Sequence, residues 1–126
     1  MEQKERESWI GKSRYYLGED NKIYVTIVGE VDDSAASEYQ NTGIKFINMV
    51  AGTADVLVDI TSARKLSPQA RKAFRELAEN EKTGKVAIFG LHPVARVIAS
   101  FFMGATTKKD IRFFNSRDAA VAWLKE

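Results

Sequence analysis

The sequence predicts an α/β fold in which a mixed, mostly parallel sheet of five strands packs with four helices as a two-layer sandwich, in the order ββαβαβαβα. The length of 126 residues, with 44% apolar and 29% charged residues, suits one folded domain, expected over residues 13–126. Short β-rich runs alternate with amphipathic segments, which is typical of parallel strands joined by right-handed crossovers. The first two β-rich runs are separated only by turn-forming residues, which predicts an antiparallel hairpin.

The predicted N-terminal hairpin joins two runs of β-formers. Residues 13–17 (SRYYL) and 22–29 (KIYVTIVG) flank Gly-Glu-Asp-Asn, a composition that favours a turn. Residues 1–12 are mostly charged and are expected to be a flexible or weakly ordered tail, in which Trp9 and Ile10 could dock on the domain.

The next segment predicts a helix over residues 32–50. Asp32, Asp33 and Ser34 are all competent N-caps, and Gly52 ends the helix. Apolar or small side chains recur at helical spacing, and we expect their face to pack on the sheet: Ala36, Tyr39, Gly43, Phe46, Ile47 and Val50.

A buried strand and a second capped helix follow. Residues 56–60 (VLVDI) form a nearly continuous apolar run, as in a strand that is covered on both faces. Residues 61–67 are expected to be a loop. Ser67 then caps a helix that begins at Pro68, where the missing N–H leaves no hydrogen bond unmade. The apolar face of this helix comprises Ala70, Ala73, Phe74, Leu77 and Ala78.

The last third of the chain repeats the strand-helix alternation. Residues 85–91 predict a second buried strand, and residues 110–114 predict the last strand, after which Ser116 caps the final helix. The helix from Pro93 to Met103 is apolar nearly all round. It is therefore expected to be buried or to present an apolar surface to a ligand, a partner or a second copy of the chain, which leaves a homodimer open.

Composition excludes several classes of site. The absence of cysteine excludes a disulfide, a thiol nucleophile and a Cys-based zinc site, and one histidine excludes an all-His metal site within the chain. A Gly-rich phosphate loop is missing, and no metal or cofactor is expected. No apolar run reaches the ~20 residues of a membrane span, so the expected location is the cytoplasm.

Charge is unevenly distributed although the net charge is only +2. Residues 1–62 hold 6 Lys and Arg against 11 Asp and Glu, a balance of −5, whereas residues 63–126 hold 13 against 6, a balance of +7. The basic half could face an acidic partner or a phosphate. Nucleic acid is not expected, because no basic cluster is interleaved with exposed aromatic residues.

Candidate functional residues gather where the predicted parallel strands end. Ligands of open α/β sheets bind beyond the carboxyl ends of the strands, and helix N-termini attract anions. The segment DITSARKLS (residues 59–67) places a carboxylate, hydroxyls and two cations before a helix N-terminus. The candidate binding or regulatory residues at this edge are Asp59, Thr61, Ser62, Arg64, Lys65, Ser67, His92 and Arg96.

Other interpretations of these residues remain open. Ser67 could act only as a helix cap, and Asp59 could serve only loop hydrogen bonds. A hydrolase grouping of serine, His92 and Asp59 is conceivable at the same edge, but the nucleophile-elbow sequence G-x-S-x-G is missing. Arg96 could contact an acidic group or lay its stem over the core.

The quoted elements resemble the SpoIIAA-like, or STAS, domains, and more closely the stand-alone branch labelled STAS/CRAL-TRIO-like. The likeness covers about residues 14–125 and rests on VLVDITSARKLSPQARKAF, GKVAIFG, PVARVIASFF and DIRFFNSRDAAVAWL. It implies a STAS fold with the element order given above.

The resemblance also implies a function. Anti-sigma-factor antagonists of this family are phosphorylated at a Ser or Thr that begins the corresponding helix, and Ser67 holds that position. Their usual Asp-Ser-Ser/Thr-Gly pattern is replaced here by Leu-Ser-Pro-Gln. The resemblance thus implies a non-enzymatic regulatory module that binds a protein partner. The likeness to CRAL-TRIO folds implies an alternative, a small carrier or sensor that binds a lipid or other apolar ligand against the helix from Pro93 to Met103.

Overall fold

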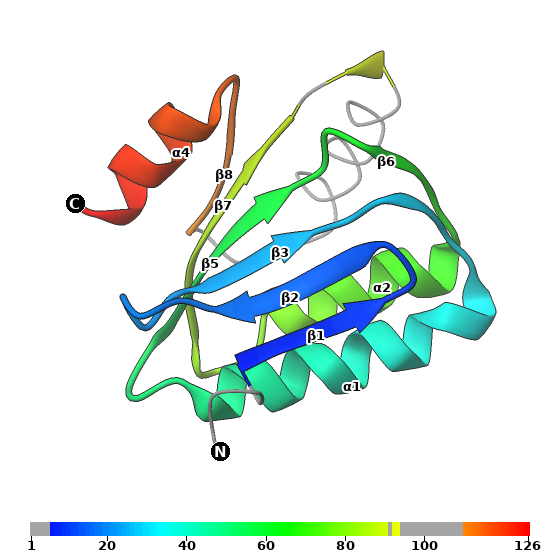
Figure 1. The fold of residues 1–126 in the computed structure, drawn as a ribbon, viewed down its shortest axis with the longest axis horizontal. Coiled ribbons are helices and arrows are strands. Elements are labelled where there is room, and N and C mark those ends of the chain that lie inside the picture. The colour runs from blue at the N-terminus through cyan, green and yellow to red at the C-terminus, as the bar shows by residue number, and fades with distance from the viewer. Residues whose placement is uncertain (1–5, 91, 94–109) are drawn as a thin grey trace.

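A computed structural model of the chain describes residues 6–90, 92–93 and 110–126. The described strands are β1 Glu7–Ile10, β2 Ser13–Leu17, β3 Ile23–Thr26, β4 Gly29–Val31, β5 Ala54–Asp59, β6 Ala63–Leu66, β7 Thr83–Phe89 and β8 Ile111–Phe114. The described helices are α1 Asp33–Met49, α2 Pro68–Ala78 and α4 Arg117–Leu124 (Figure 1). The helix predicted from Pro93 to Met103, together with Arg96, lies outside the described residues, Pro93 excepted.

The main sheet has the strand order β1-β2-β3-β5-β7-β8. The β2–β3 pair is antiparallel, which confirms the predicted hairpin, and β3, β5, β7 and β8 run parallel. The mixed, mostly parallel α/β sheet predicted from the sequence is therefore confirmed. Its strands are six rather than five, because part of the segment expected to be a tail adds to the edge.

That added strand is β1. It pairs antiparallel with β2, so that Trp9 lies opposite Arg14 and Ile10 opposite Ser13. Ile10 is buried in the core, whereas Trp9 is 57% exposed. The charged composition of residues 1–12 predicted weak order, but one buried apolar side chain and a free strand edge provide a partner that composition does not reveal.

A two-stranded parallel ladder, β4 with β6, extends the sheet beyond β3 and β5. The sequence predicted one strand over residues 22–29 and a loop over 61–67, and both expectations are wrong in detail. β3 ends at Thr26, and Gly29, which has a positive φ of 76°, starts β4 as a separate strand. In β6, Ala63 and Leu66 are buried and the two residues between them are exposed, so this strand lacks the alternation that would reveal it in the sequence.

The predicted helix caps are confirmed. Asp32 caps α1 by accepting the amide of Ala35 at 2.9 Å. Ser67 caps α2 and Ser116 caps α4, each through a side-chain oxygen that accepts the amide three residues ahead at 3.1 Å. The capping side chains satisfy N–H groups that have no partner inside the helix.

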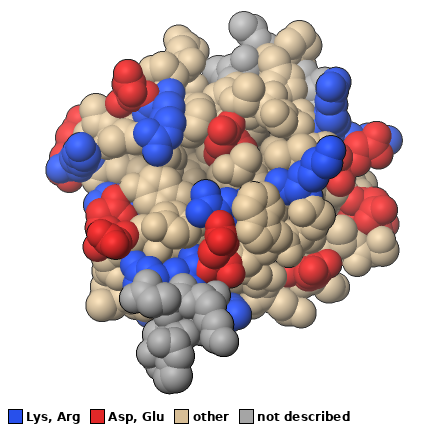
Figure 2. Space-filling model, viewed as in Figure 1, with Lys and Arg blue, Asp and Glu red and all other residues tan. Residues whose placement is uncertain are grey.

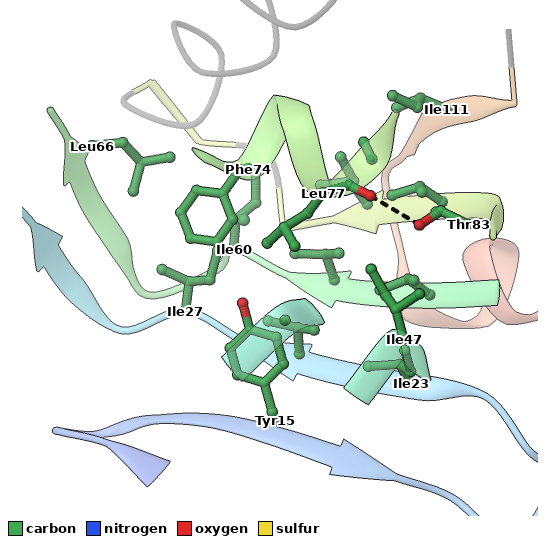
Figure 3. Close-up of a pocket in the computed structure, with 17 residues that line it drawn as sticks. Tyr15, Ile23, Ile27, Ile47, Ile60, Leu66, Phe74, Leu77, Thr83 and Ile111 are labelled. Atoms are coloured by element: carbon green, nitrogen blue, oxygen red, sulfur yellow. Dashed lines mark hydrogen bonds between the residues drawn. The ribbon is translucent and has the colours of Figure 1, made fainter. Parts of the chain in front are cut away.

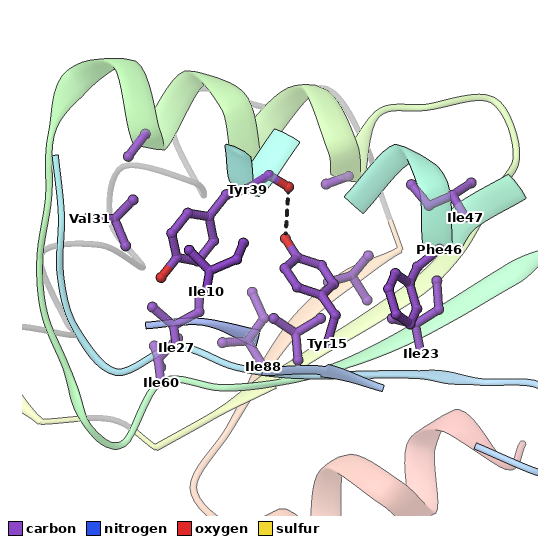
Figure 4. Packing of buried hydrophobic residues seen from close by; sticks show 14 of the residues in the cluster. Ile10, Tyr15, Ile23, Ile27, Val31, Tyr39, Phe46, Ile47, Ile60 and Ile88 are labelled. Atoms are coloured by element: carbon purple, nitrogen blue, oxygen red, sulfur yellow. Dashed lines mark hydrogen bonds between the residues drawn. The ribbon is translucent and has the colours of Figure 1, made fainter. Parts of the chain in front are cut away.

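Helices cover both faces of the sheet, one layer more than the predicted two-layer sandwich. α1 and α2 cover one face and α4 the other (Figure 1). The larger core lies between the sheet and α1, where Phe46 is fully buried and Tyr15 donates a hydrogen bond to the carbonyl of Tyr39 at 3.2 Å (Figure 4). A smaller cluster beneath α4 comprises Leu57, Ala87, Phe89, Ala120, Trp123 and Leu124.

Candidate functional site

The turn after β5 is fixed by backbone hydrogen bonds. The Asp59 carboxylate accepts the amide of Thr61 at 2.8 Å, and the amide of Gly29 donates to the carbonyl of Ser62 at 2.9 Å. Thr61 and Ser62 are exposed. The turn therefore presents two hydroxyls on a backbone that both neighbouring strands hold in place.

β6 carries the chain from this turn to the N-terminus of α2. Arg64 and Lys65 are exposed, while their neighbours Ala63 and Leu66 point into the core. The amide of Ser67 donates to the carbonyl of Val31 at 2.9 Å, which ties the start of α2 to the end of β4. We call the surface formed by the exposed Thr61, Ser62, Arg64 and Lys65 and the half-buried Ser67 the β6 rim.

The N-terminus of α1 lies next to the β6 rim. Val31, which accepts the Ser67 amide, directly precedes the α1 cap Asp32. The hydroxyl of Ser34 and the amide of Ala35 donate to Asp32, and these hydrogen bonds hold the pKa of its carboxyl below the ordinary value. The N-termini of α1 and α2 therefore lie next to each other. The carboxylate of Asp32 caps α1, and the hydroxyl of Ser67 caps α2.

His92 joins this edge from the loop after β7. Its Nε2 lies 3.1 Å from the carbonyl oxygen of Ile60, the residue between Asp59 and Thr61. Gly90 approaches Thr61 so closely that a Cβ at position 90 would lie 2.5 Å from the Thr61 amide nitrogen. The predicted meeting of the 59–67 segment with the loop at 92 is therefore present in the structure.

The hydrolase alternative finds no assembled grouping here. In the described part of the chain, no hydrogen bond joins the His92 ring to Ser62, Ser67 or Asp59, and the ring nitrogen nearest the turn contacts a carbonyl instead. A Ser-His-Asp mechanism needs the base within hydrogen-bond reach of the nucleophile. The contact of the His92 ring with the Ile60 carbonyl is consistent with a structural role for His92 at this turn.

Asp59 lies in a different place from the other candidate residues. It lies on the face of the sheet that α4 covers, because it alternates with Val56 and Val58, which pack in the core under α1 and α2. Its carboxylate lines a groove of about 560 Å³ on that face. The sequence predicted one cluster of residues, but the structure divides them between the β6 rim and this groove.

We call this groove the hairpin groove. The sequence did not predict it. It lies between the β2–β3 hairpin and the first residue of α4, over the part of the sheet that α4 leaves open. Alternation along the hairpin could have revealed it, since every second side chain of β2 and β3 is polar or aromatic. The lining residues are Arg14, Tyr16, Gly18, Glu19, Asp20, Tyr24, Val25, Thr26, Leu57, Asp59, Phe89 and Arg117.

A second, much smaller cavity of about 80 Å³ lies within the large core (Figure 3). Phe74 and Leu77 of α2 face Ile23 and Ile27 of β3 and the following segment across it. The hydroxyls of Tyr15 and Thr83 are the polar side-chain groups in its described lining, and Thr83 donates to the carbonyl of Leu77 at 2.8 Å. This cavity is apolar and enclosed by the main core residues.

The charge pattern agrees with a mixed surface. Figure 2 shows Lys and Arg side chains interspersed with Asp and Glu over the face that it presents. No described helix is long and apolar enough to cross a membrane. Within the described residues, no group of three histidine or acidic side chains is arranged to hold a metal ion.

Comparisons with solved structures place this fold. The anti-sigma factor antagonist SpoIIAA in its unphosphorylated form is similar with a TM-score of 0.60 at 12% identity, over 90% of this chain and 97% of that chain. The phosphorylated form of the Bacillus cell fate determinant SpoIIAA gives 0.58 at 13% identity, over 89% and 98%. An uncharacterized protein of the DUF3478 family from Shewanella loihica PV-4, with a SpoIIAA-like fold, gives 0.61 at 17% identity, over 94% and 90%.

These likenesses confirm the STAS, or SpoIIAA-like, fold that the sequence resembled. A comparison with curated proteins finds no match. The family model that matches residues 28–126 is described as a domain of unknown function, DUF7793, and the match covers most of the chain. The chain therefore belongs to the DUF7793 family and has a SpoIIAA-like fold.

Proposed function

We propose that this protein is a non-enzymatic regulatory module that binds a protein partner through the β6 rim, as an anti-sigma-factor antagonist does. The observation that carries the proposal is the position of Ser67, whose hydroxyl caps α2 at 3.1 Å from the Ala70 amide, next to the exposed cations Arg64 and Lys65. The fold is shared with SpoIIAA, which has been solved in phosphorylated and unphosphorylated forms.

A phosphate on Ser67 would be stabilised in this position. It would add close to two negative charges at pH 7, and the N-terminus of a helix attracts an anion through its free N–H groups and its dipole. Arg64 and Lys65 precede it by three and two residues and would add to the same field. A partner that reads this rim would therefore meet a different charge after modification.

The partner would recognise exposed polar groups on a rigid backbone. The Thr61 and Ser62 hydroxyls lie at one end of the rim, and the capped start of α2 lies at the other. The ladder of β4 with β6 joins these ends, so little ordering is needed on binding. Such a surface favours a protein partner, because its groups lie along a strand and none of the five rim residues lines either of the two cavities described above.

The test compares two serines in the same local geometry. Ser116 caps α4 with the same 3.1 Å hydrogen bond, and α4 and β6 lie on opposite sides of Figure 1, so Ser116 provides a matched control. Mass spectrometry of the protein from its native source detects phosphate on Ser67. Pull-downs with Ser67→Ala, Ser67→Asp, Ser116→Ala and Ser116→Asp then show which serine changes the partners.

We expect the Ser67 variants to change the set of bound partners and the Ser116 variants to leave it as in the wild type. Aspartate is itself a good N-cap, so Ser67→Asp keeps α2 folded while it adds a charge. Identical partners for all five proteins, or equal changes at both serines, would count against the rim as the regulatory surface.

The carrier alternative has weaker support. The apolar cavity in the described core is about 80 Å³, well below the ~300–1,000 Å³ of small-molecule sites. Native mass spectrometry of freshly purified protein tests it directly, and a co-purified lipid would favour the carrier over the regulatory module. Location in the cytoplasm and self-association remain predictions from the sequence.

A further inference from the structure

The hairpin groove has a regular construction that the proposed function does not use. Two rows of side chains cross the open face of the sheet, set by the strand register. One row runs from Trp9 through Arg14 and Thr26 to Asp59 and Phe89. The other row, one pleat away, has a floor of aromatic and apolar side chains: Tyr16, Tyr24 and Leu57.

The aromatic part of the groove is partly exposed and ordered. The rings of Tyr16 and Tyr24 form a cross-strand pair with centroids 6.2 Å apart. Leu57 and Phe89 continue the apolar floor toward α4, and both belong to the cluster beneath that helix. The two rings are tilted by 48° to each other, and aromatic rings beside an apolar floor favour a ligand that has an apolar body.

The charges of the groove favour a cation. Three carboxylates line it, those of Glu19, Asp20 and Asp59, against the guanidiniums of Arg14 and Arg117. Arg14 is already paired with Glu7, which lies outside the lining. Arg117 remains in the lining, and the Arg6 guanidinium lies beside it, where it donates to the carbonyls of Leu17 and Gly18. The three carboxylates therefore outnumber these two guanidiniums.

The contacts of Tyr24 indicate the sign of the local field. Its hydroxyl donates a hydrogen bond to Asp20. Burial, followed by this hydrogen bond and the Asp20 charge, raises the pKa of Tyr24 to about 12, and the opposing effect of Arg117 is smaller. A negative field beside an aromatic face is the environment in which organic cations bind.

Asp59 provides the charged end of the site. Its Oδ1 accepts the Thr61 amide at 2.8 Å, and no other described group donates to its side chain. The second carboxylate oxygen can therefore accept hydrogen bonds from a ligand without disturbing the turn. Thr26 lies directly opposite Asp59 in the register and adds a hydroxyl beside it.

The position of Arg14 determines which tyrosine ring is available to a ligand. Its guanidinium lies 4.6 Å from the ring centroid of Tyr16 and 5.7 Å from that of Trp9, and the Glu7 carboxylate holds it there. One face of Tyr16 is therefore already occupied by a cation. The ring of Tyr24, nearer to Asp59 in the sheet, is left as the aromatic wall for a ligand.

From this arrangement we propose that the hairpin groove binds an organic ammonium ion with an apolar or aromatic body, its ammonium at Asp59 and its body against Tyr24, Leu57 and Phe89. A free amine and a lysine side chain of a peptide share this chemistry. The volume of about 560 Å³ suits either a small amine or one side chain with its neighbours.

The experiment is an NMR titration of the full chain. The probes are 2-phenylethylammonium, its neutral analogue 2-phenylethanol and the anionic analogue 3-phenylpropionate. The dipeptide N-acetyl-Phe-Lys-amide is the second cationic probe, and it distinguishes a peptide source from a free amine. We expect the cations to shift the amide signals of residues 24–26 and 57–59, whereas the anion leaves them unmoved at the same concentration.

Variants test the named contacts. Asp59→Asn keeps an oxygen for the Thr61 amide but removes the charge, and it should weaken ammonium binding about threefold to fivefold. Glu38→Gln removes the same charge from an exposed position on α1, at the opposite layer, and should leave binding unchanged. Tyr24→Leu removes the aromatic ring and should weaken the binding of both cationic probes. Circular dichroism confirms that each variant is folded.

The outcomes separate this proposal from the regulatory role of the β6 rim. Tighter binding of the amine assigns the groove to a free ligand, and tighter binding of the dipeptide assigns it to a protein segment. Equal shifts by cation, anion and neutral probe, or unchanged binding in folded Asp59→Asn, would overturn the proposal. Neither result bears on Ser67, which lies outside the groove lining.

Discussion

The two faces of the sheet differ in how completely helices cover them. On the α1–α2 face, side chains from β2, β3, β5 and β7 meet two helices in a continuous apolar core. On the α4 face, α4 is the one helix among the described residues. Its eight residues cover β5, β7 and β8, and the hairpin groove lies beside it. The same strands supply both faces, since alternate residues point in opposite directions.

The closed face provides most of the stability, whereas the open face is available for recognition. A closed apolar face contributes free energy of folding in proportion to buried area. A buried polar group on this face, the Tyr39 hydroxyl, is hydrogen-bonded and donates to Ser13 at 2.7 Å. An open face can carry charge and aromatic rings that contact solvent or a ligand. The predictions below compare the two faces.

The largest expected effect is on the closed face. Phe46 has no exposed surface, and its ring packs 5.6 Å from that of Tyr15. Phe46→Ala removes this packing and leaves a cavity, so it should lower the free energy of unfolding by about 3–5 kcal/mol. Urea denaturation followed by circular dichroism measures it. A loss below about 1 kcal/mol would show that this core is loosely packed.

The two tryptophans compare covered and open parts of the α4 face. Trp123 is 7% exposed, with Phe114 at 5.7 Å and Arg112 at 5.2 Å from its ring, whereas Trp9 is 57% exposed. Trp123→Ala should cost about 3 kcal/mol and Trp9→Ala less than about 0.5 kcal/mol. Thermal and urea unfolding of both variants checks the ratio. Similar losses would mean that the hairpin side carries stability as well.

Ser67 should have a moderate effect that depends on the substituent. Ser67→Ala removes the oxygen that accepts the Ala70 amide and should destabilise the protein by about 1 kcal/mol. Ser67→Asp replaces the oxygen and should restore most of that loss. Urea midpoints of the two variants measure this, and equal destabilisation by Ala and Asp would exclude the capping role.

The smallest effect concerns the pH dependence of the open face. The pKa of Tyr24 is raised to about 12 from 10.0, first by burial and then by the hydrogen bond to Asp20. The folded protein keeps this proton longer than the unfolded chain, so the contribution is complete below pH 10 and is lost as the pH rises toward 12. Tyrosinate absorbance should show Tyr24 ionising late, and earlier in Asp20→Asn. An unchanged Tyr24 transition in that variant would exclude Asp20 as a cause.

Much of the fold could be predicted from local signals in the sequence. The α1 and α2 helices follow from caps at Asp32 and Ser67 and from apolar spacing. The bounds of α1 differ from prediction by one residue at each end, and α2 begins at the predicted Pro68. The hairpin follows from a turn composition between two β-rich runs. These features are recoverable because each depends on residues close together in the chain.

The rest depends on partners that are distant in sequence. Strand β1 exists because Ile10 finds the core and β2 offers an edge, and β6 exists because β4 lies beside it. The candidate residues were predicted at one edge of the sheet, and the described ones lie there, but the sequence could not show that Asp59 faces away from the core under α2. That direction follows from the register of a strand buried on both faces, whose apolar run lacks a visible alternation.

The most direct test uses neighbouring side chains of one strand. Leu57 lines the hairpin groove, while Val56 and Val58 line the small apolar cavity on the other face. In a methyl NMR titration with 2-phenylethylammonium, we expect the Leu57 methyl signals to move and those of Val56 and Val58 to stay in place. Movement of the valine methyls with a fixed Leu57 would contradict the division of the sheet into a closed and an open face.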